Sequence, residues 1–461
     1  MDFQRLSYHW IGRSPSLTDV AEFFTQQTFE NWHGSYAYIY EAETDILLIV
    51  DTIASFPLFY TVKDDTIYVS DDAVLIAQKA KLSLDEQNVS EYLKTSYVTE
   101  TATLFRDVFA LNPGTKVIIN KKTGEIKQEQ WLMLNYSLKQ SHDRDYIKEF
   151  DDCLTAVFTD LVKRLDGRKV LIPLSGGCDS RTVAATLKRV GYNNVFCLSY
   201  GKEGNFETER SRVVAKTLGF EWFWCEYKGE TWRRLLESKE YIDFIKYANV
   251  GETIGCIQAL PAMQEVKKRG LVPNDTVVVP GHTLDVIMGS HLPTMVIRSW
   301  AKKNLVDYIL KIHYSLNASV PNGNIERWTR IIPDTDNLNV LMEHYMLWEY
   351  RNRQSKFVGK DIRVYDFLGY SYEMPFWDSR VVKFASSLPF ELLVGRKFQY
   401  EYTQKVIDPI VGLKLTYQQP STSYSWLKTI LKKSAFVRYL LRLRSAGSVR
   451  RKPRSSAAHR A

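Results

Sequence analysis

Residues 169–190 read KVLIPLSGGCDSRTVAATLKRV, and the fold class can be predicted from this segment and its surroundings. Its start, residues 169–174, is a short run of aliphatic and β-branched side chains, which is typical of a buried parallel strand. The run stops at a pair of glycines, after which Asp179 or Ser180 can serve as the N-cap of a helix. Apolar residues then recur at helical spacing, namely Val183, Ala184, Leu187 and Val190. The pattern predicts a strand, a tight loop and a helix.

The loop between strand and helix has the residues of an anion site. Gly176 and Gly177 let successive backbone N–H groups converge, and the helix N-terminus adds partial positive charge. Ser175 and Ser180 supply further donors. Asp179 would repel a bare phosphate, so its presence indicates a carboxylate that meets the phosphates through Mg²⁺.

The spacing S-G-G-x-D-S excludes two common phosphate loops, because it has neither the lysine of a Walker A motif nor the glycine spacing of a dinucleotide fingerprint. It resembles the pyrophosphate loop of the ATP pyrophosphatases, which cleave ATP between the α and β phosphates. Cys178 occupies a position that varies in that family, and we interpret it as a filler. An ordinary strand-to-helix turn is the alternative, because serine, glycine and aspartate also make such turns.

Strands and helices continue to alternate around this loop. Apolar runs at 194–200 and 220–227 predict further parallel strands, 275–280 predicts another buried strand, and 207–218 predicts a helix. An amphipathic pattern over 137–168 predicts another helix ahead of the first strand. This order predicts an α/β domain with a doubly wound parallel sheet, in which ligands bind at the carboxyl ends of the strands.

The pattern of residues 1–135 predicts a smaller, sheet-rich α+β domain. Residues 34–80 hold three alternating apolar segments followed by a short helix. They resemble the Ntn-type glutaminase domain of asparagine synthetases, where a Gly-x-Phe-Ala strand leads into an Arg-Asp-x-x-Gly-x-x-Pro-Leu-Tyr-Tyr turn. The matching residues are Gly34, Ala37, Asp51, Pro57, Leu58 and Tyr60.

The nucleophile of that glutaminase is missing from this sequence. The family uses an N-terminal cysteine exposed by removal of the initiator methionine, whereas Met1 is here followed by Asp2 and no cysteine precedes Cys153. An amidase step of that type has no attacking group without the thiol. We therefore expect a degenerate glutaminase-like domain without this activity.

The resemblance to asparagine synthetases extends into the second half of the chain. The segment Gly281–His291 and the preceding Pro280 resemble the family segment Ser-Gly-Glu-Gly-x-Asp-Glu, which is followed shortly by a glycine, with matches at Gly281, Asp285 and Gly289. Pro280, His282 and Val286 replace a serine and two glutamates of that segment. Later matches are Pro375, Phe376, Asp378, Leu388 and Pro389 in one segment, and Lys414, Pro420 and Trp426 in a closing loop.

The resemblance implies a two-step reaction with ATP. A carboxylate attacks the α phosphorus to give an acyl-adenylate and pyrophosphate, and ammonia or an amine then attacks the adenylate. Lys414 would neutralise developing charge, and His282 would accept a proton from the incoming amine. Asp179 and Asp285 would bind Mg²⁺. The remaining contacts to ATP would come from Ser175, Gly176, Gly177 and Ser180 at the pyrophosphate, and from Leu174, Leu198, Pro280 and Gly281 around the adenosine.

Each of these roles has a simpler alternative. A lysine such as Lys414 is usually solvated surface, His282 can merely cap a strand or a helix, and Asp285 can be a plain N-cap. The substitutions at His282 and Val286 also leave open a non-catalytic member of the family that binds nucleotide or a partner enzyme.

Size and composition place the chain among globular proteins. Its 461 residues suffice for two or three domains. No apolar run approaches a membrane span and the start has no signal-peptide core, so we expect a cytoplasmic protein. The five cysteines form no C-x-x-C pair, which argues for reduced thiols and against a structural zinc site.

The net charge of +8 belongs to the C-terminal tail. Residues 432–461 hold ten Lys or Arg and no acidic residue, so the rest of the chain carries −2 and gives no reason to propose nucleic-acid binding. Residues 425–445 predict a basic amphipathic helix that rests on an anionic membrane at its inner face or packs on the domain. The last dozen residues are expected to be disordered.

We thus predict a degenerate glutaminase-like domain at 1–135, a synthetase domain at 136–424 and a basic tail at 425–461. The expected partners are a small-molecule or sugar carboxylate and an ammonia or amine donor, which is free or supplied by a separate protein. Relatives of this kind amidate uronic acids of surface polysaccharides or close a ring within one molecule, and both remain open. Asparagine formation is less favoured because residues 281–289 are altered.

Overall fold

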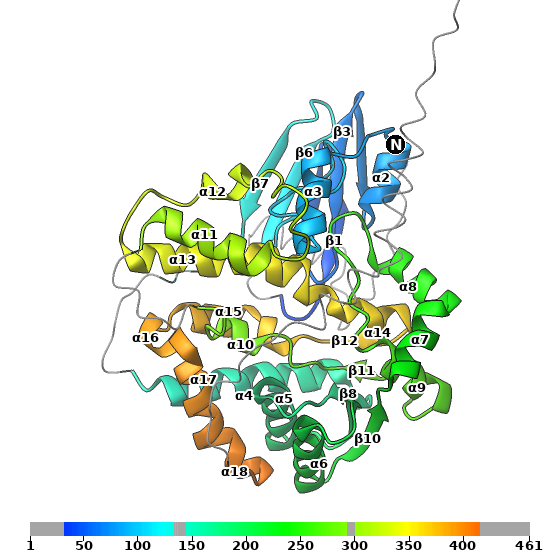
Figure 1. Cartoon of the computed structure of the whole chain (residues 1–461), viewed down its shortest axis with the longest axis vertical. Coiled ribbons are helices and arrows are strands. Elements are labelled where there is room, and N and C mark those ends of the chain that lie inside the picture. The colour runs from blue at the N-terminus through cyan, green and yellow to red at the C-terminus, as the bar shows by residue number, and fades with distance from the viewer. Residues whose placement is uncertain (1–31, 133, 135, 137–143, 293–299, 415–461) are drawn as a thin grey trace, which may run out of the picture. The chain divides into compact units, whose positions relative to one another are not determined.

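The computed structural model describes residues 32–132, 134, 136, 144–292 and 300–414. A five-stranded sheet follows the order β10-β9-β8-β11-β12, and every neighbouring pair in it is parallel (Figure 1). The strands are β8 (Val170–Pro173), β9 (Val195–Gly201), β10 (Glu221–Glu226), β11 (Val277–Val278) and β12 (Ser371–Tyr372). Val170, Leu171 and Ile172 are completely buried, as expected for a strand that is covered on both faces.

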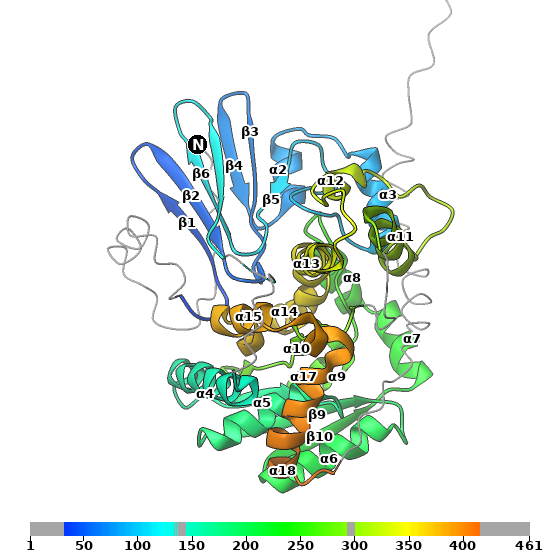
Figure 2. The same ribbon diagram turned by 90° about the vertical axis from the view of Figure 1, so that its left-hand side faces the viewer.

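Helices pack on both faces of this sheet. The crossovers from β8 to β9 and from β9 to β10 contain α5 and α6, whereas the chain reaches β11 by crossing back past β8. Because such crossovers are right-handed, this reversal sends the later helices to the opposite face. Figure 2 shows β9 and β10 between α9 on one side and α6 on the other. The bounds are α4 (Tyr146–Leu165), α5 (Cys178–Arg189), α6 (Phe206–Leu218), α7 (Gly229–Glu237), α8 (Lys239–Ala248), α9 (Leu260–Arg269) and α14 (Arg363–Phe367).

The expected parallel sheet is therefore present, but two helix starts differ from the prediction. Helix α5 begins at Cys178 with Gly177 as its N-cap, because the side chains of Asp179 and Ser180 bond to other groups. Helix α4 begins at Tyr146, so the described residues Arg144 and Asp145 of the predicted helix are not helical, and the Asp145 carboxylate caps α4 by accepting the Lys148 N–H at 3.0 Å. Residues 137–143 lie outside the described residues.

Two antiparallel sheets make up the N-terminal part, with orders β1-β2-β6-β7 and β4-β3-β5. Residues 34–80 form four strands rather than the predicted three. The extra hairpin arises because Asp64 and Asp65 both adopt positive φ, at 48° and 57°, and so make the tight turn that joins β3 and β4. The bounds are β1 (Ala37–Glu41), β2 (Asp45–Val50), β3 (Phe59–Lys63), β4 (Thr66–Ser70), β5 (Phe109–Ala110), β6 (Thr115–Asn120) and β7 (Ile126–Gln130).

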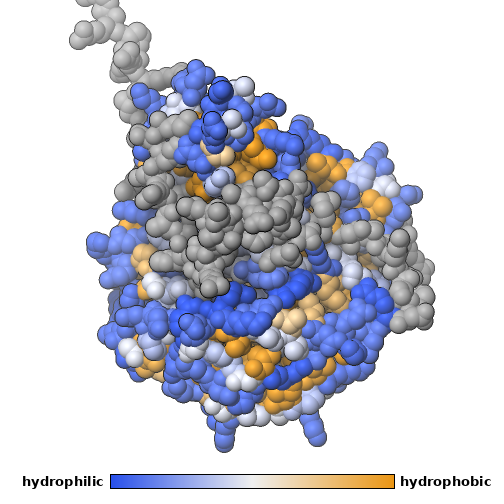
Figure 3. All heavy atoms as spheres, turned by 180° about the vertical axis from the view of Figure 1, so that it is seen from behind, coloured by the Kyte–Doolittle hydropathy of each residue, from blue (hydrophilic) through white to orange (hydrophobic). Residues whose placement is uncertain are grey.

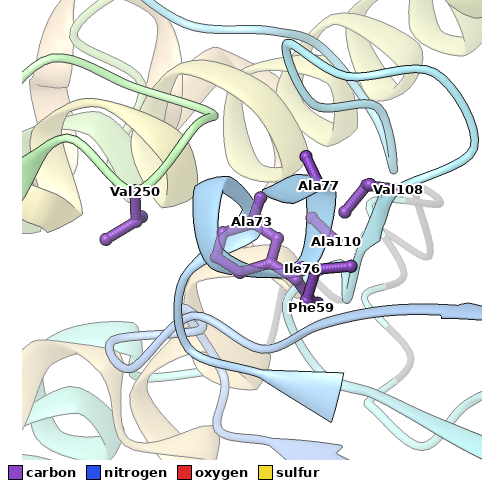
Figure 4. Close-up of a cluster of buried hydrophobic side chains, with 7 residues drawn as sticks. All are labelled: Phe59, Ala73, Ile76, Ala77, Val108, Ala110 and Val250. Carbon is purple, nitrogen blue, oxygen red and sulfur yellow. The ribbon is translucent and has the colours of Figure 1, made fainter. Parts of the chain in front are cut away.

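Helix α2 (Ala73–Lys79) anchors the β4-β3-β5 sheet through a buried apolar cluster (Figure 4). Its members are Phe59, Ala73, Ile76, Ala77, Val108, Ala110 and Val250. Val250 comes from the segment after α8, and its carbonyl accepts the N–H of Ala73 at 3.0 Å. The N-terminal sheets and the later part of the chain therefore share hydrophobic and backbone contacts. The domain boundary at residue 135 stays a prediction.

A buried polar cluster joins α11 (Lys302–His313) to α13 (Leu338–Glu349). Glu349 is 1% exposed, and its Oε1 lies 2.9 Å from both His291 Nδ1 and His313 Nε2. Its Oε2 accepts from Gln354 Nε2 at 3.1 Å. Burial alone would raise the pKa of Glu349, but the two histidines outweigh burial and hold this pKa well below its usual value.

The other helices of the described residues are mostly short. They are α3 (Glu86–Thr95), α10 (Leu284–Ile287), α12 (Glu326–Thr329), η2 (Tyr350–Gln354), η3 (Val358–Ile362), η4 (Pro375–Trp377), α15 (Ser379–Ser386), α16 (Phe390–Leu393), η5 (Val394–Arg396), α17 (Lys397–Tyr402), η6 (Thr403–Ile407) and α18 (Asp408–Val411). No helix in the described ranges is long and apolar enough to cross a bilayer. The basic amphipathic helix predicted for 425–445 lies outside the described residues.

The surface shows mixed hydropathy, and the cysteines are unpaired. Figure 3 shows the reverse face, where hydrophilic and hydrophobic residues of the described part are interspersed. All five cysteines lie in described segments, and none of them is disulfide-bonded.

Candidate functional site

The reversal of strand order between β8 and β11 is where an open α/β sheet binds ligands. The predicted loop follows β8, and the segment from Gly281 follows β11. The two segments pack closely: a Cβ added at Gly281 would lie 2.6 Å from the Ser180 nitrogen and 2.9 Å from the Asp179 carbonyl carbon. A Cβ at Gly176 would lie 2.7 Å from Cα of Glu207 in α6. Glycine is thus required at both positions by close backbone approach.

The serines of the loop hold its backbone in shape. Ser180 Oγ accepts the N–H of Ser175 at 3.0 Å, and Ser175 Oγ accepts the N–H of Gly177 at 3.1 Å. The two hydroxyl oxygens also lie 3.1 Å apart. These bonds fix the turn that leads into α5. The backbone N–H groups left unpaired in the turn and the partial positive charge at the N-terminus of α5 suit the binding of an anion.

Asp179 lies in the first turn of α5 and links three elements. Its Oδ2 accepts the N–H of Asp285 at 3.1 Å, and its Oδ1 accepts Nε2 of Gln399 at 2.6 Å. Burial and then the nearby Asp285 carboxylate raise the pKa of Asp179 well above its usual value, although both hydrogen bonds and Arg396 oppose the rise. A divalent cation bound between the Asp179 and Asp285 carboxylates would offset the repulsion between their negative charges.

The donor set for Mg²⁺ at this place consists of Asp179 and Asp285. Within the described ranges no group of three or more His, Cys, Asp or Glu is arranged to hold a metal ion. Mg²⁺ commonly takes one or two carboxylates and completes its shell with phosphate oxygens and water. The pair therefore fits an ion that arrives with a nucleotide, and the metal role of both residues stays a prediction.

The residues expected around the adenosine lie level with the carboxyl end of β8: Leu174 and Pro280 follow β8 and β11, and Leu198 in β9 pairs with Pro173. Leu174 and Leu198 are 2% and 1% exposed, and the N–H of Leu174 donates to the carbonyl of Leu198 at 2.8 Å. Pro280 is buried at the end of β11, directly before Gly281. The structure brings these four residues to the same edge of the sheet as the loop.

His282 occupies the turn between β11 and α10. Its Nε2 lies 3.8 Å from Oδ2 of Asp361, and the hydroxyl of the following Thr283 donates to Oε1 of Gln354 at 3.1 Å. Val286 is buried with 5% exposure, so this position offers no polar group to a substrate. The base role of His282 stays a prediction.

Lys414 is not brought to the loop. It is exposed, and Gly412 two residues earlier approaches Thr217, in the last turn of α6. The loop touches Glu207 in the first turn of that helix, and ten residues of helix span about 15 Å. Pro420 and Trp426 of the same predicted segment lie outside the described residues, so the catalytic role of Lys414 stays a prediction.

Three residues at the site were missed by sequence reasoning. Arg210 Nη1 donates to the carbonyl of Gly176 at 3.2 Å, which places a cation beside the loop. Gln399 and Arg396 come from the α17 region and act on Asp179. No local pattern could identify them, because each lies at least 34 residues from its partner and the contact exists only in the fold.

Asp51 organises the turn in the N-terminal part that was predicted to resemble a glutaminase turn. It is buried: Oδ1 accepts the N–H groups of Ile53 at 2.9 Å and Ser55 at 3.1 Å, and Oδ2 accepts that of Tyr36 at 2.8 Å. Ala54 adopts φ +50°, a conformation that glycine adopts more easily, at the position where the family pattern has glycine.

A small cavity lies beside this turn, between residues of the N-terminal sheets and of the later segments. Its lining residues are Gly34, Ser35, Asp51, Thr52, Ile53, Arg164, Glu373, Met374, Pro375, Trp377 and Asp378. Arg164 pairs with Glu373 through two hydrogen bonds of 3.0 Å, and Asp378 lies 3.1 Å from Nδ1 of His33. None of the lining residues is a cysteine.

Comparison with known proteins finds a matching domain model and a distant relative. Residues 16–132 match the model of the glutamine amidotransferase domain. The chain is 23% identical over 204 residues to asparagine synthetase [glutamine-hydrolyzing] 1 of Bacillus subtilis, a match that covers 43% of this chain and 32% of the relative. The chain thus spans about a third of the curated relative that it matches.

Solved structures with local similarity include three synthetases. An NH3-dependent NAD synthetase from Campylobacter jejuni has 18% identity, a TM-score of 0.23, and coverage of 32% of this chain and 61% of its own. An NMN synthetase from Francisella tularensis has 14% identity, a TM-score of 0.23, and coverage of 48% and 92%. A glutamine-dependent NAD+ synthetase from Acinetobacter baumannii has 9% identity, a TM-score of 0.21, and coverage of 58% and 64%. Overlaps of this size carry no conclusion about this chain.

Proposed function

We propose that this chain, a member of the asparagine synthetase family, is an ATP-dependent carbon–nitrogen ligase. A carboxylate substrate would be adenylated with release of pyrophosphate, and ammonia or an amine would then displace AMP to give an amide. The observation that carries the proposal is the meeting of the Ser175–Ser180 loop with Asp285 through Asp179, at the edge where the strand order reverses.

In the first step the loop would receive the departing pyrophosphate. The start of α5 presents backbone donors and a positive helix end, and Arg210 adds a full positive charge beside Gly176. Bound Mg²⁺ would supply further neutralisation of phosphate charge. Asp179 and Asp285 would hold that ion, and its charge would lower the raised pKa of Asp179.

In the second step His282 would act on the incoming nitrogen. The amine attacks the acyl carbon, a C–N bond forms, and the C–O bond to AMP breaks with its electron pair leaving on AMP. His282 accepts the proton that the nitrogen loses, which histidine can do near neutral pH.

The nitrogen would come from outside the N-terminal part. The cavity beside the Asp51 turn has no cysteine among its lining residues, and the first cysteine of the given sequence is Cys153. Val50 also stands where the family turn has arginine. These features support a glutaminase-like part that serves a structural purpose and leaves ammonia or another amine as the donor.

The experiment is pyrophosphate release from Mg-ATP against a panel of carboxylates with ammonium present. The panel includes aspartate, other amino-acid derivatives and nucleotide-linked uronic acids. Release that depends on one acid, with AMP as co-product, is the expected result and identifies the acyl substrate class. Replacing ammonium by glutamine should give no amide, whereas formation of glutamate would contradict the loss of glutaminase activity.

A second candidate is a non-catalytic member that binds nucleotide or a partner enzyme. One observation favours it: the buried Val286 replaces a glutamate, which removes a polar group from the site. Calorimetric binding of Mg-ATP without release of pyrophosphate for any acid of the panel would support this candidate.

The basic tail carries a separate proposal, contact with the inner face of a membrane. Its ten cationic residues within 432–461 support attraction to anionic lipids. Sedimentation with anionic vesicles, with the full chain and with a chain ending at residue 424, tests it. Equal binding of both chains would refute the role of the tail.

A further inference from the structure

A carboxylate that the proposed reaction does not yet use faces His282. Asp361 lies on η3, far from His282 in sequence, and its Oδ2 is 3.8 Å from Nε2 of the imidazole ring. Both side chains are partly exposed, at 21% for His282 and 26% for Asp361. Contacts at catalytic sites are often long in the free protein and tighten when substrate is bound.

Three ionisable groups from other elements lie beside Asp361, and none of them competes for its charge. The neighbours of the carboxylate are the Cys256 thiol from the segment before α9, the Tyr200 phenol at the end of β9 and the Tyr365 phenol on α14. Burial raises the pKa of Cys256, and Asp361 raises it further. All three groups are therefore neutral near pH 7. The next carboxylate along the chain from His282 is Asp285, three residues on, and its backbone N–H bonds to Asp179.

The ring nitrogen of His282 that a substrate can reach is Nε2. Nδ1 is buried and has no hydrogen-bond partner among the described residues, whereas the side chain as a whole is 21% exposed. The backbone on either side is fixed, because Gly281 packs against Ser180 and Thr283 bonds to Gln354. A proton that Nε2 accepts would therefore lie beside the Asp361 carboxylate.

We propose that Asp361 is the positioning residue of His282. Its negative charge orients the ring with Nε2 as the proton acceptor, and it stabilises the imidazolium that forms when the attacking amine loses its proton to Nε2. The inference rests on the proposed function, because it assigns the group that supports the base in amide formation. It adds a carboxylate from η3 to a site otherwise built from the loop after β8 and the turn after β11.

The first test separates the two half-reactions in Asp361→Asn, made in the full chain. Acid-dependent exchange of pyrophosphate into ATP reports adenylation, and amide production reports the second step. We expect exchange to stay within about 2-fold of wild type and amide formation to fall about 10- to 100-fold, at the lower end of general-base effects. Asp361→Glu should recover part of the loss, because it restores a carboxylate.

The matched control is Asp366→Asn. Asp366 lies on α14, five residues beyond Asp361, and accepts a hydrogen bond from Tyr247 rather than facing His282. This variant should leave both half-reactions unchanged. Equal loss of exchange and amide formation in Asp361→Asn would overturn the proposal, and so would a variant with unchanged amide formation.

A second measurement does not depend on catalysis. Crystal structures of wild type and of Asp361→Asn compare the orientation of the His282 ring. We expect Nε2 to face residue 361 in wild type and the ring to turn away in Asp361→Asn, where the attraction to a carboxylate is lost. An unchanged ring in the variant would refute the positioning role. If wild type shows no exchange with any acid while the ring turns in the variant, the pairing survives and the proposed function fails.

Discussion

The contact between Gly281 and the loop allows a sharp test of the site, by Gly281→Ala. The added Cβ would lie 2.6 Å from the Ser180 nitrogen, whereas ordinary van der Waals contact begins near 3.4 Å. The two segments would have to separate by about 0.8 Å to restore that contact, at a cost of about 1–3 kcal/mol in folding free energy. Since Asp285 follows on the same segment, its N–H would move away from Asp179.

A shift of this size should matter far more for activity than for folding. Misplacing catalytic groups by about 1 Å can cost about 100-fold in rate, so we expect pyrophosphate release to fall about 10- to 100-fold. The assay is release from Mg-ATP with the most active acid of the panel, together with calorimetric affinity for Mg-ATP and the melting temperature.

The control is Gly229→Ala at the start of α7. Gly229 does not have positive φ, and a Cβ there would meet nothing within 4 Å. This variant should match wild type in rate, affinity and melting temperature. Wild-type release and ATP affinity in Gly281→Ala would refute the reasoning that the two segments must touch for the site to work.

Other substitutions test single interactions. Asp179→Asn should abolish pyrophosphate release and yet raise the melting temperature at pH 7, because burial raises the pKa of Asp179 and the charged form destabilises the fold. Glu349→Gln should lower the free energy of unfolding by about 3 kcal/mol in thermal unfolding, because it breaks a buried charged cluster. The pKa of Glu349 is depressed in the folded state. The stability difference between wild type and Glu349→Gln should therefore vanish as pH falls below the usual pKa of a glutamate. Burial lowers the pKa of Lys360 to about 8. Wild type should therefore gain up to about 3 kcal/mol relative to Lys360→Met as pH rises from 8 to 10.5, and an unchanged difference would contradict this.

The local pattern of apolar residues predicted most strands of the parallel sheet. Short apolar runs predicted the strands that became β8, β9 and β11, because a strand buried on both faces needs apolar side chains at nearly every position. The run that became β10 was also predicted, although this edge strand is only partly buried. The hairpin between β3 and β4 was missed, because two aspartates with positive φ make its turn where glycine or asparagine is the usual signal.

The first residues of the helices were harder to predict, because whether a polar side chain caps a helix depends on the other hydrogen-bond partners that it meets in the fold. Asp179 looked like an N-cap by composition, but in the fold its carboxylate reaches the N–H of Asp285. Ser180 turns back to the N–H of Ser175, and Gly177 is left as the cap.

The sequence by itself determined the loop, its glycines and the type of sheet that presents it, because these follow from backbone freedom and hydrophobic spacing over a few residues. Only the tertiary structure decided what surrounds Asp179, since Asp285 and Gln399 lie 106 and 220 residues away. Burial and a second carboxylate raise the pKa of Asp179, and these are properties of packed segments rather than of local sequence. The same reason explains why Asp361 could be found only after the chain had folded against His282.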